Sequence, residues 1–305
     1  MSKRDTLMRR MPKHVTVFEV GPRDGLQNEA TPIPTDMKIA FVKTLSDAGL
    51  KWIETTSFVN PKAVPQLADA GEVMAGIERQ PGARYPVLVP NERGMQRALE
   101  SGVDAIAVFT AASEQFSQAN VRATIDETFE RFAPVIGLAQ QNNVWTRGYV
   151  SMAFHCPYEG QIAPEKAIDV AQRLFDLGID EVAIADTIGR ATPLDISRFL
   201  DLAVTSLPMN QLAFHLHDTN GLALSNVMLA LEAGVTVIDG AAGGLGGCPF
   251  APGAPGNLAT EQLVTLLDGL GIDTGVDAAA VEKAGQEIRR FLDGTSETSW
   301  GLGAA

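Results

Sequence analysis

The stretch DLGIDEVAIADT, residues 176–187, joins the end of a helix to the start of a buried strand. Glycine suits the left-handed residue that ends a helix, and the apolar run after it is typical of a strand covered on both faces. The same order of small residue, glycine and apolar run occurs in DAGLKWIE (47–54), ESGVDAIAV (100–108) and EAGVTVID (232–239). This recurrence predicts a unit of helix and strand that is repeated along the chain.

Over the whole chain, eight short apolar runs alternate with amphipathic segments. The runs are 14–20, 52–58, 84–90, 105–111, 147–154, 181–187, 211–218 and 235–243. Between them, segments such as 36–50 and 164–178 carry apolar residues at helical spacing and end at a glycine. Eight strand–helix units in about 230 residues have the length and order of the (β/α)8 TIM barrel, an α/β fold.

A doubly wound open sheet is the alternative arrangement of such units. It normally has a glycine-rich phosphate loop after an early strand, whereas the text after 14–20 is GPRDGLQNE. We therefore expect one domain over 1–305, with the barrel at about 14–275. The segment 277–293 predicts an additional C-terminal helix after the barrel closes.

The composition excludes several classes of partner. The chain has 305 residues, 45% of them hydrophobic, and a formal net charge of −13 at pH 7. A chain this acidic repels nucleic acid and anionic lipid, and no apolar run approaches the roughly 18 residues of a membrane span. Residues 1–13 are rich in basic side chains but lack the apolar core of a secretory signal. We expect no nucleic-acid or membrane partner and a cytoplasmic location.

Polar side chains gather at the predicted C-terminal ends of the strands, where barrels of this kind carry their chemistry. They are Arg23, Asp24, Glu54, Ser57, Asp186, Thr187, His215, His217, Cys248 and Asn257. His215 and His217 share one face of their strand, because side chains alternate along a strand. A lone histidine in an apolar strand is usually a core residue, but a pair at a strand end near carboxylates favours a metal site.

The donors available to the two histidines indicate which ion such a site would take. With Asp24 and the amide oxygen of Asn257, the ligands are nitrogen and oxygen atoms, a mixture that suits Mg²⁺ or Mn²⁺. Zinc is the alternative if the thiol of Cys248 is a ligand.

Cys248 lies in GLGGCPFAPGAPGN (244–257), a stretch dominated by glycine and proline. Two interpretations are open: a mobile loop that carries a thiol to the site as a general acid or base, and a tight loop with an incidental thiol. The other cysteine, Cys156, and its neighbour His155 lie in HCPYEG, and we expect both to be mainly structural.

Arg23 also has two interpretations. It is a fixed positive charge for an oxyanion that forms on the substrate, or it is one half of a rim ion pair with Glu54 or Asp186. Both can hold at once, because a carboxylate that orients Arg23 would support its charge at the substrate.

Four separated motifs contain most of these residues. They are EVGPRDGLQNE (19–29), IETTSFVNPKAVPQLAD (53–69), AFHLHDTNGLALSN (213–226) and GLGGCPFAPGAPGNLATE (244–261). Together they closely resemble the 3-hydroxy-3-methylglutaryl-CoA (HMG-CoA) lyase family of the DRE-TIM metallolyase superfamily. The resemblance implies a divalent-metal carbon–carbon lyase that cleaves the acyl-CoA thioester HMG-CoA to acetyl-CoA and acetoacetate, a reaction of leucine catabolism and ketone-body formation. It is also compatible with a homodimer.

The resemblance assigns roles to the residues at the strand ends. The implied ligands of the Mg²⁺ or Mn²⁺ ion are Asp24, His215, His217 and Asn257. Arg23 is implied at the thioester carbonyl, Cys248 as the loop cysteine that protonates the acetyl-CoA enolate, and Glu54 and Asp186 as supporting carboxylates. We expect Gln27, Ser57 and Thr187 to contact the substrate together with Arg23. Either His215 or Asp24 takes the proton of the substrate hydroxyl.

Several features leave alternatives open. Positions 155, 252 and 255 differ from the commonest sequence of the family, and position 220 is variable within it, so a longer 3-hydroxy-3-alkylglutaryl-CoA is an alternative substrate. A Claisen-type synthase of the same superfamily usually has a further C-terminal domain, and the cysteine loop favours the lyase. A zinc amidohydrolase carries its histidine pair on the first strand, and a silent barrel usually lacks a ligand. For the CoA phosphates, Lys62 and Arg147 are the weak candidates, and we expect solvation at the surface for both.

Overall fold

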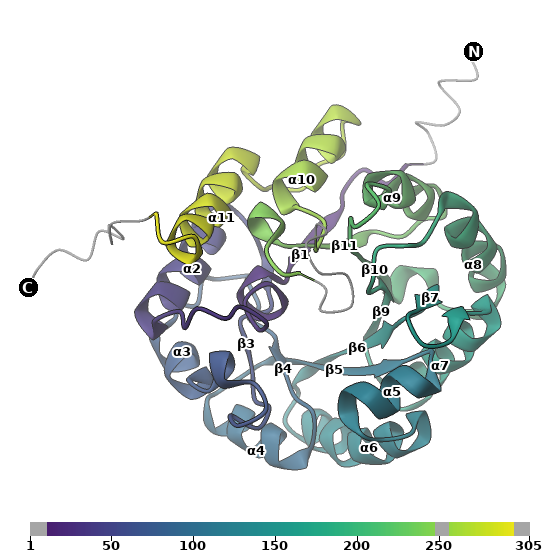
Figure 1. Ribbon diagram of the computed structural model, residues 1–305, viewed down its shortest axis with the longest axis horizontal. Coiled ribbons are helices and arrows are strands. Elements are labelled where there is room, and N and C mark those ends of the chain that lie inside the picture. The colour runs from purple at the N-terminus through teal and green to yellow at the C-terminus, as the bar shows by residue number, and fades with distance from the viewer. Residues whose placement is uncertain (1–10, 248–255, 296–305) are drawn as a thin grey trace, which may run out of the picture.

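Parallel strands form a barrel that is ringed by helices (Figure 1). In a computed structural model, the chain is described over residues 11–247 and 256–295. The strands of the barrel are β1 (Thr16–Glu19), β2 (Trp52–Ile53), β3 (Thr56–Ser57), β4 (Val87–Leu88), β5 (Ala105–Ala111), β6 (Trp145–Ser151), β9 (Glu181–Asp186), β10 (Leu212–Leu216) and β11 (Val237–Gly240). Their order in the sheet is β2-β1-β11-β10-β9-β6-β5-β4-β3.

The two ends of this sheet belong to one predicted strand, 52–58, which closes the barrel. β2 pairs with β1, β3 pairs with β4, and the Ile53 N–H donates to Arg84 O at 3.1 Å. The segment therefore bonds a neighbour on each side, and the eight predicted strands form the predicted (β/α)8 barrel. The fold prediction is confirmed.

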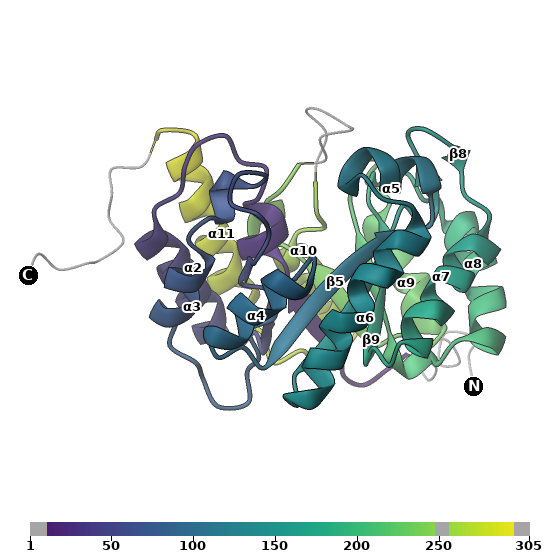
Figure 2. The ribbon, with the colours of Figure 1, turned by 90° about the horizontal axis from the view of Figure 1, so that it is seen from below.

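The helices cover the outside of the barrel, as the view from the side shows (Figure 2). They are α2 (Thr35–Asp47), α3 (Ala70–Gly76), α4 (Glu92–Glu100), α5 (Glu114–Val121), α6 (Ile125–Gln141), α7 (Pro164–Asp176), α8 (Pro193–Ser206), α9 (Ala223–Glu232), α10 (Thr260–Gly269) and α11 (Ala278–Leu292). The predicted helices 36–50, 164–178 and 277–293 correspond to α2, α7 and α11. Gly49 has φ +100° after α2, and Gly178 has φ +86° after α7, as expected of residues that end helices.

The apolar core has two parts. Most of it lies between the strands and the helices, where α11 packs against α2. The smaller part fills the barrel itself and consists of Leu88, Ala107, Tyr149, Ala183 and Ala213. Three of these five side chains are alanines, so the interior has room for larger polar groups.

Arg147 uses part of this interior space, and the expectation that it is solvated at the surface is wrong. Its side chain is fully buried, and its guanidinium carbon lies 3.8 Å from the centre of the Phe18 ring. The reason is strand alternation, because Arg147 and Tyr149 are two apart on β6 and both point into the barrel.

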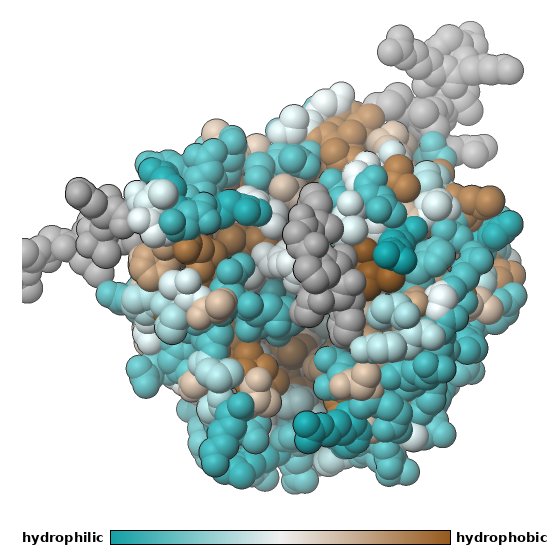
Figure 3. Space-filling model, viewed as in Figure 1, coloured by the Kyte–Doolittle hydropathy of each residue, from teal (hydrophilic) through white to brown (hydrophobic). Residues whose placement is uncertain are grey.

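Within the residues that the structure describes, no helix has the length and apolar character needed to cross a membrane. Most of the face seen in Figure 3 carries hydrophilic residues. Its view is that of Figure 1, onto the end of the barrel that carries the site described next.

Candidate metal centre

A tight turn after β1 carries Arg23 and Asp24. This turn is the short π-helix η1 (Gly21–Gly25), and the carbonyl of Val20 accepts the N–H groups of Arg23, Asp24 and Gly25 at 3.1, 2.7 and 3.2 Å. Because one carbonyl holds three consecutive amides, the two side chains leave the backbone in fixed directions.

The carboxylate of Glu19 ties this turn to the segments that follow the adjacent strand β11. It accepts the N–H of Gly21 at 2.8 Å, the N–H of Ala242 at 2.9 Å and the hydroxyl of Thr260 at 2.6 Å. Burial raises the pKa of Glu19 to about 7, although these hydrogen bonds act in the opposite direction. Glu19 thereby joins β1 to the loop after β11 and to the start of α10.

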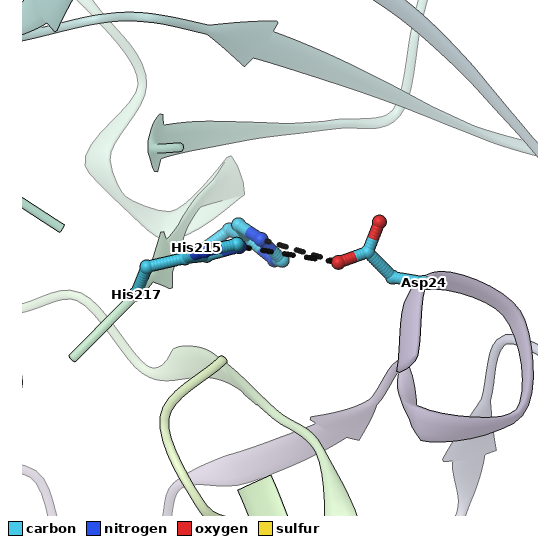
Figure 4. Close-up of side chains that lie close together, drawn as sticks. All are labelled: Asp24, His215 and His217. Carbon is cyan, nitrogen blue, oxygen red and sulfur yellow. Dashed lines mark ion pairs between the residues drawn. The ribbon is translucent and has the colours of Figure 1, made fainter. Parts of the chain in front are cut away.

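Asp24, His215 and His217 converge at the mouth of the barrel (Figure 4). The Nε2 atoms of both histidines lie 4.0 Å from Oδ2 of Asp24. This separation is too long for a hydrogen bond. It is also longer than the roughly 3.0 to 3.4 Å between neighbouring ligand atoms of one cation, so binding a cation here requires the side chains to move slightly inward. The shared face predicted for the two histidines is therefore observed.

The charges around this cluster favour the protonation states that a cation needs. Although burial disfavours the charged form, Arg23 and the two histidines hold the pKa of Asp24 well below its usual range. Burial, with His215 as a second cause, lowers the pKa of His217 to about 4, while Asp24 opposes this shift. At neutral pH the site offers a carboxylate and a neutral imidazole, the forms that bind metal ions.

Asn257 lies in the same cluster, but its amide nitrogen faces Asp24. Nδ2 donates to Asp24 Oδ2 at 2.9 Å and to Leu245 O at 3.0 Å. The predicted fourth ligand is thus brought to the site as a hydrogen-bond donor, and binding a cation through Oδ1 requires the amide to turn.

Arg23 is held between two carboxylates. Its Nε and one terminal nitrogen lie 2.8 and 2.7 Å from Oε2 of Glu54, and the other terminal nitrogen lies 2.7 Å from Oδ1 of Asp24. Burial is the largest influence on the pKa of Glu54 and raises it, while the positive charge of Arg23 acts to lower it. Of the two ion-pair partners considered for Arg23, Glu54 is the one observed.

The remaining predicted residues occupy different positions around the mouth. Gln27 joins the cluster, since its amide nitrogen lies 3.3 Å from Oδ1 of Asp24. The hydroxyl of Ser57 donates to Leu88 O at 3.2 Å, and the hydroxyl of Thr187 accepts the Met152 N–H at 2.9 Å. These two hydroxyls therefore bond the backbone of adjacent segments.

Asp186 orders the loop that follows β9. Its carboxylate accepts the N–H groups of Arg190 at 3.1 Å and Ala191 at 2.8 Å. Burial raises the pKa of Asp186 to about 6 against the effect of these bonds. These hydrogen bonds go to backbone groups, so Asp186 stands apart from the Arg23 ion pairs.

Two residues beneath the cluster were missed by the sequence reasoning. Asp239 Oδ2 lies 3.1 Å from Nδ1 of His215, and the Tyr149 hydroxyl donates to Glu54 Oε2 at 3.2 Å. The Tyr149 ring meets the His215 ring edge to face, with centres 5.9 Å apart. A usable signal existed for Asp239, because it ends the apolar run VTVID (235–239).

Cys248 lies outside the described residues, but the residues around its segment border the metal cluster. The Asn257 N–H donates to Gly246 O at 3.3 Å, and Gly246 has φ +92°. The second cysteine, Cys156, is buried with its sulfur 3.0 Å from the Ser113 hydroxyl, in keeping with a structural role. His155 lies 3.3 Å from Asp195 on α8.

Comparisons with known proteins show the family to which the chain belongs. The model of the HMGL-like family matches residues 14–288. The 3-hydroxy-3-methylglutaryl-CoA lyase, cytoplasmic, of Rattus norvegicus is 49% identical over 94% of this chain and 84% of its own length. The hydroxymethylglutaryl-CoA lyase, mitochondrial, of Homo sapiens is 48% identical over 93% of this chain and 87% of its own length. The crystal structure of hydroxymethylglutaryl-CoA lyase from Pseudomonas aeruginosa has a TM-score of 0.91 and 48% identity, and covers 95% of this chain and 97% of that one.

Proposed function

Because the chain belongs to the HMGL-like family, we propose that it is a carbon–carbon lyase that cleaves HMG-CoA to acetyl-CoA and acetoacetate. The observation that carries the proposal is the largely buried cluster of Asp24, His215 and His217 beside a fixed arginine. These side chains come from the ends of β1 and β10, and they meet where a barrel of this kind binds its substrate.

The donor set fits a divalent cation. One carboxylate oxygen and two imidazole nitrogens lie within 4.8 Å of one another, and they would hold Mg²⁺ or Mn²⁺ with room for further oxygen ligands. Asn257 is the fourth protein ligand in this proposal, through Oδ1 after its amide turns. A cation held here would lower the pKa of the tertiary hydroxyl of the substrate.

Residues of the chain account for the steps of the cleavage reaction. The hydroxyl proton leaves, the bond between C2 and C3 of the acyl chain breaks, and its electrons pass into the thioester to give the acetyl-CoA enolate and acetoacetate. Arg23 supplies a fixed positive charge for the enolate oxygen, because Glu54 and Asp24 hold its guanidinium. Cys248 returns a proton to the enolate carbon.

Two residues are candidates for the proton acceptor, His215 and Asp24. Both nitrogens of His215 face carboxylates, Nδ1 toward Asp239 and Nε2 toward Asp24. Asp24 is ionised, and its two oxygens accept from Arg23 and from Asn257. Gln27, which lies beside Asp24, contacts the substrate in this proposal together with Ser57 and Thr187. Asp186 supports the mouth from the loop after β9.

The test is an assay of the purified protein with HMG-CoA and Mn²⁺. We expect equal amounts of acetyl-CoA and acetoacetate, loss of both products with a chelator, and recovery with added ion. A series of 3-hydroxy-3-alkylglutaryl-CoA esters determines the acyl chain. Release of free CoA from acetyl-CoA and a 2-keto acid, without cleavage of any ester, would instead identify a Claisen-type synthase and overturn the proposal.

Location and assembly complete the proposal. We propose a cytoplasmic homodimer, although the names of the relatives include both cytoplasmic and mitochondrial proteins. Fractionation of cells and light scattering of the purified protein test the two statements separately.

A further inference from the structure

Four ionisable side chains form a connected row across the barrel interior beneath the metal cluster. They are His215, Asp239, Arg147 and Glu181. His215 contacts Asp239 through Nδ1 at 3.1 Å, and the other oxygen of Asp239 lies 2.6 Å from a terminal nitrogen of Arg147. Arg147 forms a second ion pair, at 3.1 Å, with Glu181. Arg147 has no exposed surface and Asp239 has almost none, whereas the side chain of Glu181 is 13% exposed.

We propose that Asp239 and Arg147 are positioning residues that fix the tautomer and the orientation of His215 for the cation. This inference rests on the metal site of the proposed function. Asp239 Oδ2 accepts a hydrogen bond from the protonated Nδ1 of His215, which leaves the lone pair of Nε2 directed at the position shared with Asp24.

Arg147 determines which oxygen of Asp239 is available. Its terminal nitrogen donates to Oδ1 at 2.6 Å, so Oδ2 is the oxygen that remains for His215. Tyr149 flanks both groups, since its hydroxyl lies 3.4 Å from Arg147 and its ring packs against His215. Because Arg147 fixes one oxygen of Asp239, and the other oxygen bonds His215, Arg147 also fixes the orientation of the His215 ring.

His217 provides the contrast within the same site. Its Nδ1 is buried and has no hydrogen-bond partner among the described residues, whereas Nε2 lies 4.0 Å from Asp24. Only His215 is thus oriented by a charged partner. That partner is Asp239, and Arg147 holds Asp239 in turn.

Asp239→Asn gives a specific expectation because Arg147 remains in place. The amide oxygen must accept from Arg147, so the amide nitrogen faces Nδ1 of His215 and donates to it. His215 is then forced to carry its proton on Nε2, where it can no longer bind a metal ion. The shape of the site is kept while the tautomer is reversed.

The experiment measures the affinity for Mn²⁺ and the tautomer of His215 directly. The chain has four histidines, so their ¹⁵N signals in labelled protein can be assigned by substitution. In the metal-free wild-type protein we expect the proton of His215 on Nδ1. For Asp239→Asn we expect the proton on Nε2 and Mn²⁺ binding weakened about 100-fold.

Glu181→Gln is the matched control, because it removes a largely buried carboxylate from the nitrogen of Arg147 that does not face Asp239. We expect it to change the dissociation constant for Mn²⁺ by less than about threefold. A wild-type His215 protonated on Nε2 overturns the inference without any variant, and so does a folded Asp239→Asn protein that binds Mn²⁺ as the wild type does. A wild-type protein that binds no Mn²⁺ would overturn the metal role in the proposed function, which is a separate failure.

Discussion

Glu54→Gln removes the main charge partner of Arg23 and keeps the shape of the side chain. In the wild-type protein, Oε2 of Glu54 lies 2.8 and 2.7 Å from two nitrogens of Arg23 and accepts the Tyr149 hydroxyl at 3.2 Å. The substitution turns two charge-assisted contacts into contacts with a neutral amide. Since charge-assisted hydrogen bonds are roughly twice as strong as neutral ones, about 2 to 3 kcal/mol of the energy that holds Arg23 is lost.

The loss should appear in the chemical step and leave substrate binding unchanged. Arg23 keeps its contact with Asp24 at 2.7 Å, so the guanidinium remains in the site but is drawn toward Asp24 and away from the substrate oxygen. If the whole of this energy acts on the enolate, kcat falls about 30- to 160-fold while KM changes little.

Two measurements follow the effect. Steady-state cleavage of HMG-CoA gives kcat and KM, and exchange of the acetyl-CoA methyl protons in D₂O reports enolate formation without cleavage. We expect both rates to fall by the same factor, and Glu181→Gln serves as the control for a buried carboxylate changed to an amide. A kcat within about threefold of the wild type, or a higher KM at unchanged kcat, would refute the role assigned to Glu54.

The remaining predictions concern the cysteine, one glycine and a buried carboxyl group. Cys248→Ser should lower kcat at least about 100-fold, because a hydroxyl is a much weaker acid than a thiol, while calorimetry should give an unchanged affinity for Mn²⁺. Gly246→Ala should lower both the midpoint of urea unfolding and the affinity for Mn²⁺, because Gly246 has φ +92° and a Cβ would lie 2.8 Å from Nδ2 of Asn257. Glu19 has its pKa raised from 4.5 to about 7, so the folded state holds its proton more tightly and the wild type loses stability as the pH rises through that interval. The folded state loses about 3 kcal/mol of stability through this group. Urea unfolding at pH 5 and pH 8.5 should show that Glu19→Gln lacks this part of the pH dependence. An equal pH dependence in both proteins would contradict the burial assigned to Glu19.

The sequence was sufficient to predict the barrel because its signals are local. The glycine before each strand and the apolar stripe before each glycine depend on neighbouring residues, and Gly49 and Gly178 have the left-handed conformation that this pattern predicts. The division of 52–58 into β2 and β3 was not predictable in this way. It depends on the segment bonding β1 at one end and β4 at the other, and these partners lie far apart in the sequence.

The site was predictable where the chemistry lies at the ends of strands. Arg23, Asp24, His215 and His217 were all placed at the mouth, and the structure brings them together. Arg147 was misjudged because a charged residue in a strand is normally solvated. Its burial depends on two carboxylates from other strands, and no local pattern identifies them.

The alanines inside the barrel explain how so many polar groups fit beneath the metal cluster. Large branched side chains usually fill the interior of such barrels. Here the strand register sets Tyr149 level with Ala183, and Ala183 level with Ala213, so two small side chains lie next to one large aromatic ring. The space they leave allows the Tyr149 ring to reach His215 and its hydroxyl to reach Glu54. At this level the barrel interior therefore contains less apolar packing and more connected polar and aromatic groups. Through Tyr149, these groups contact Glu54, which binds Arg23, and they also contact His215.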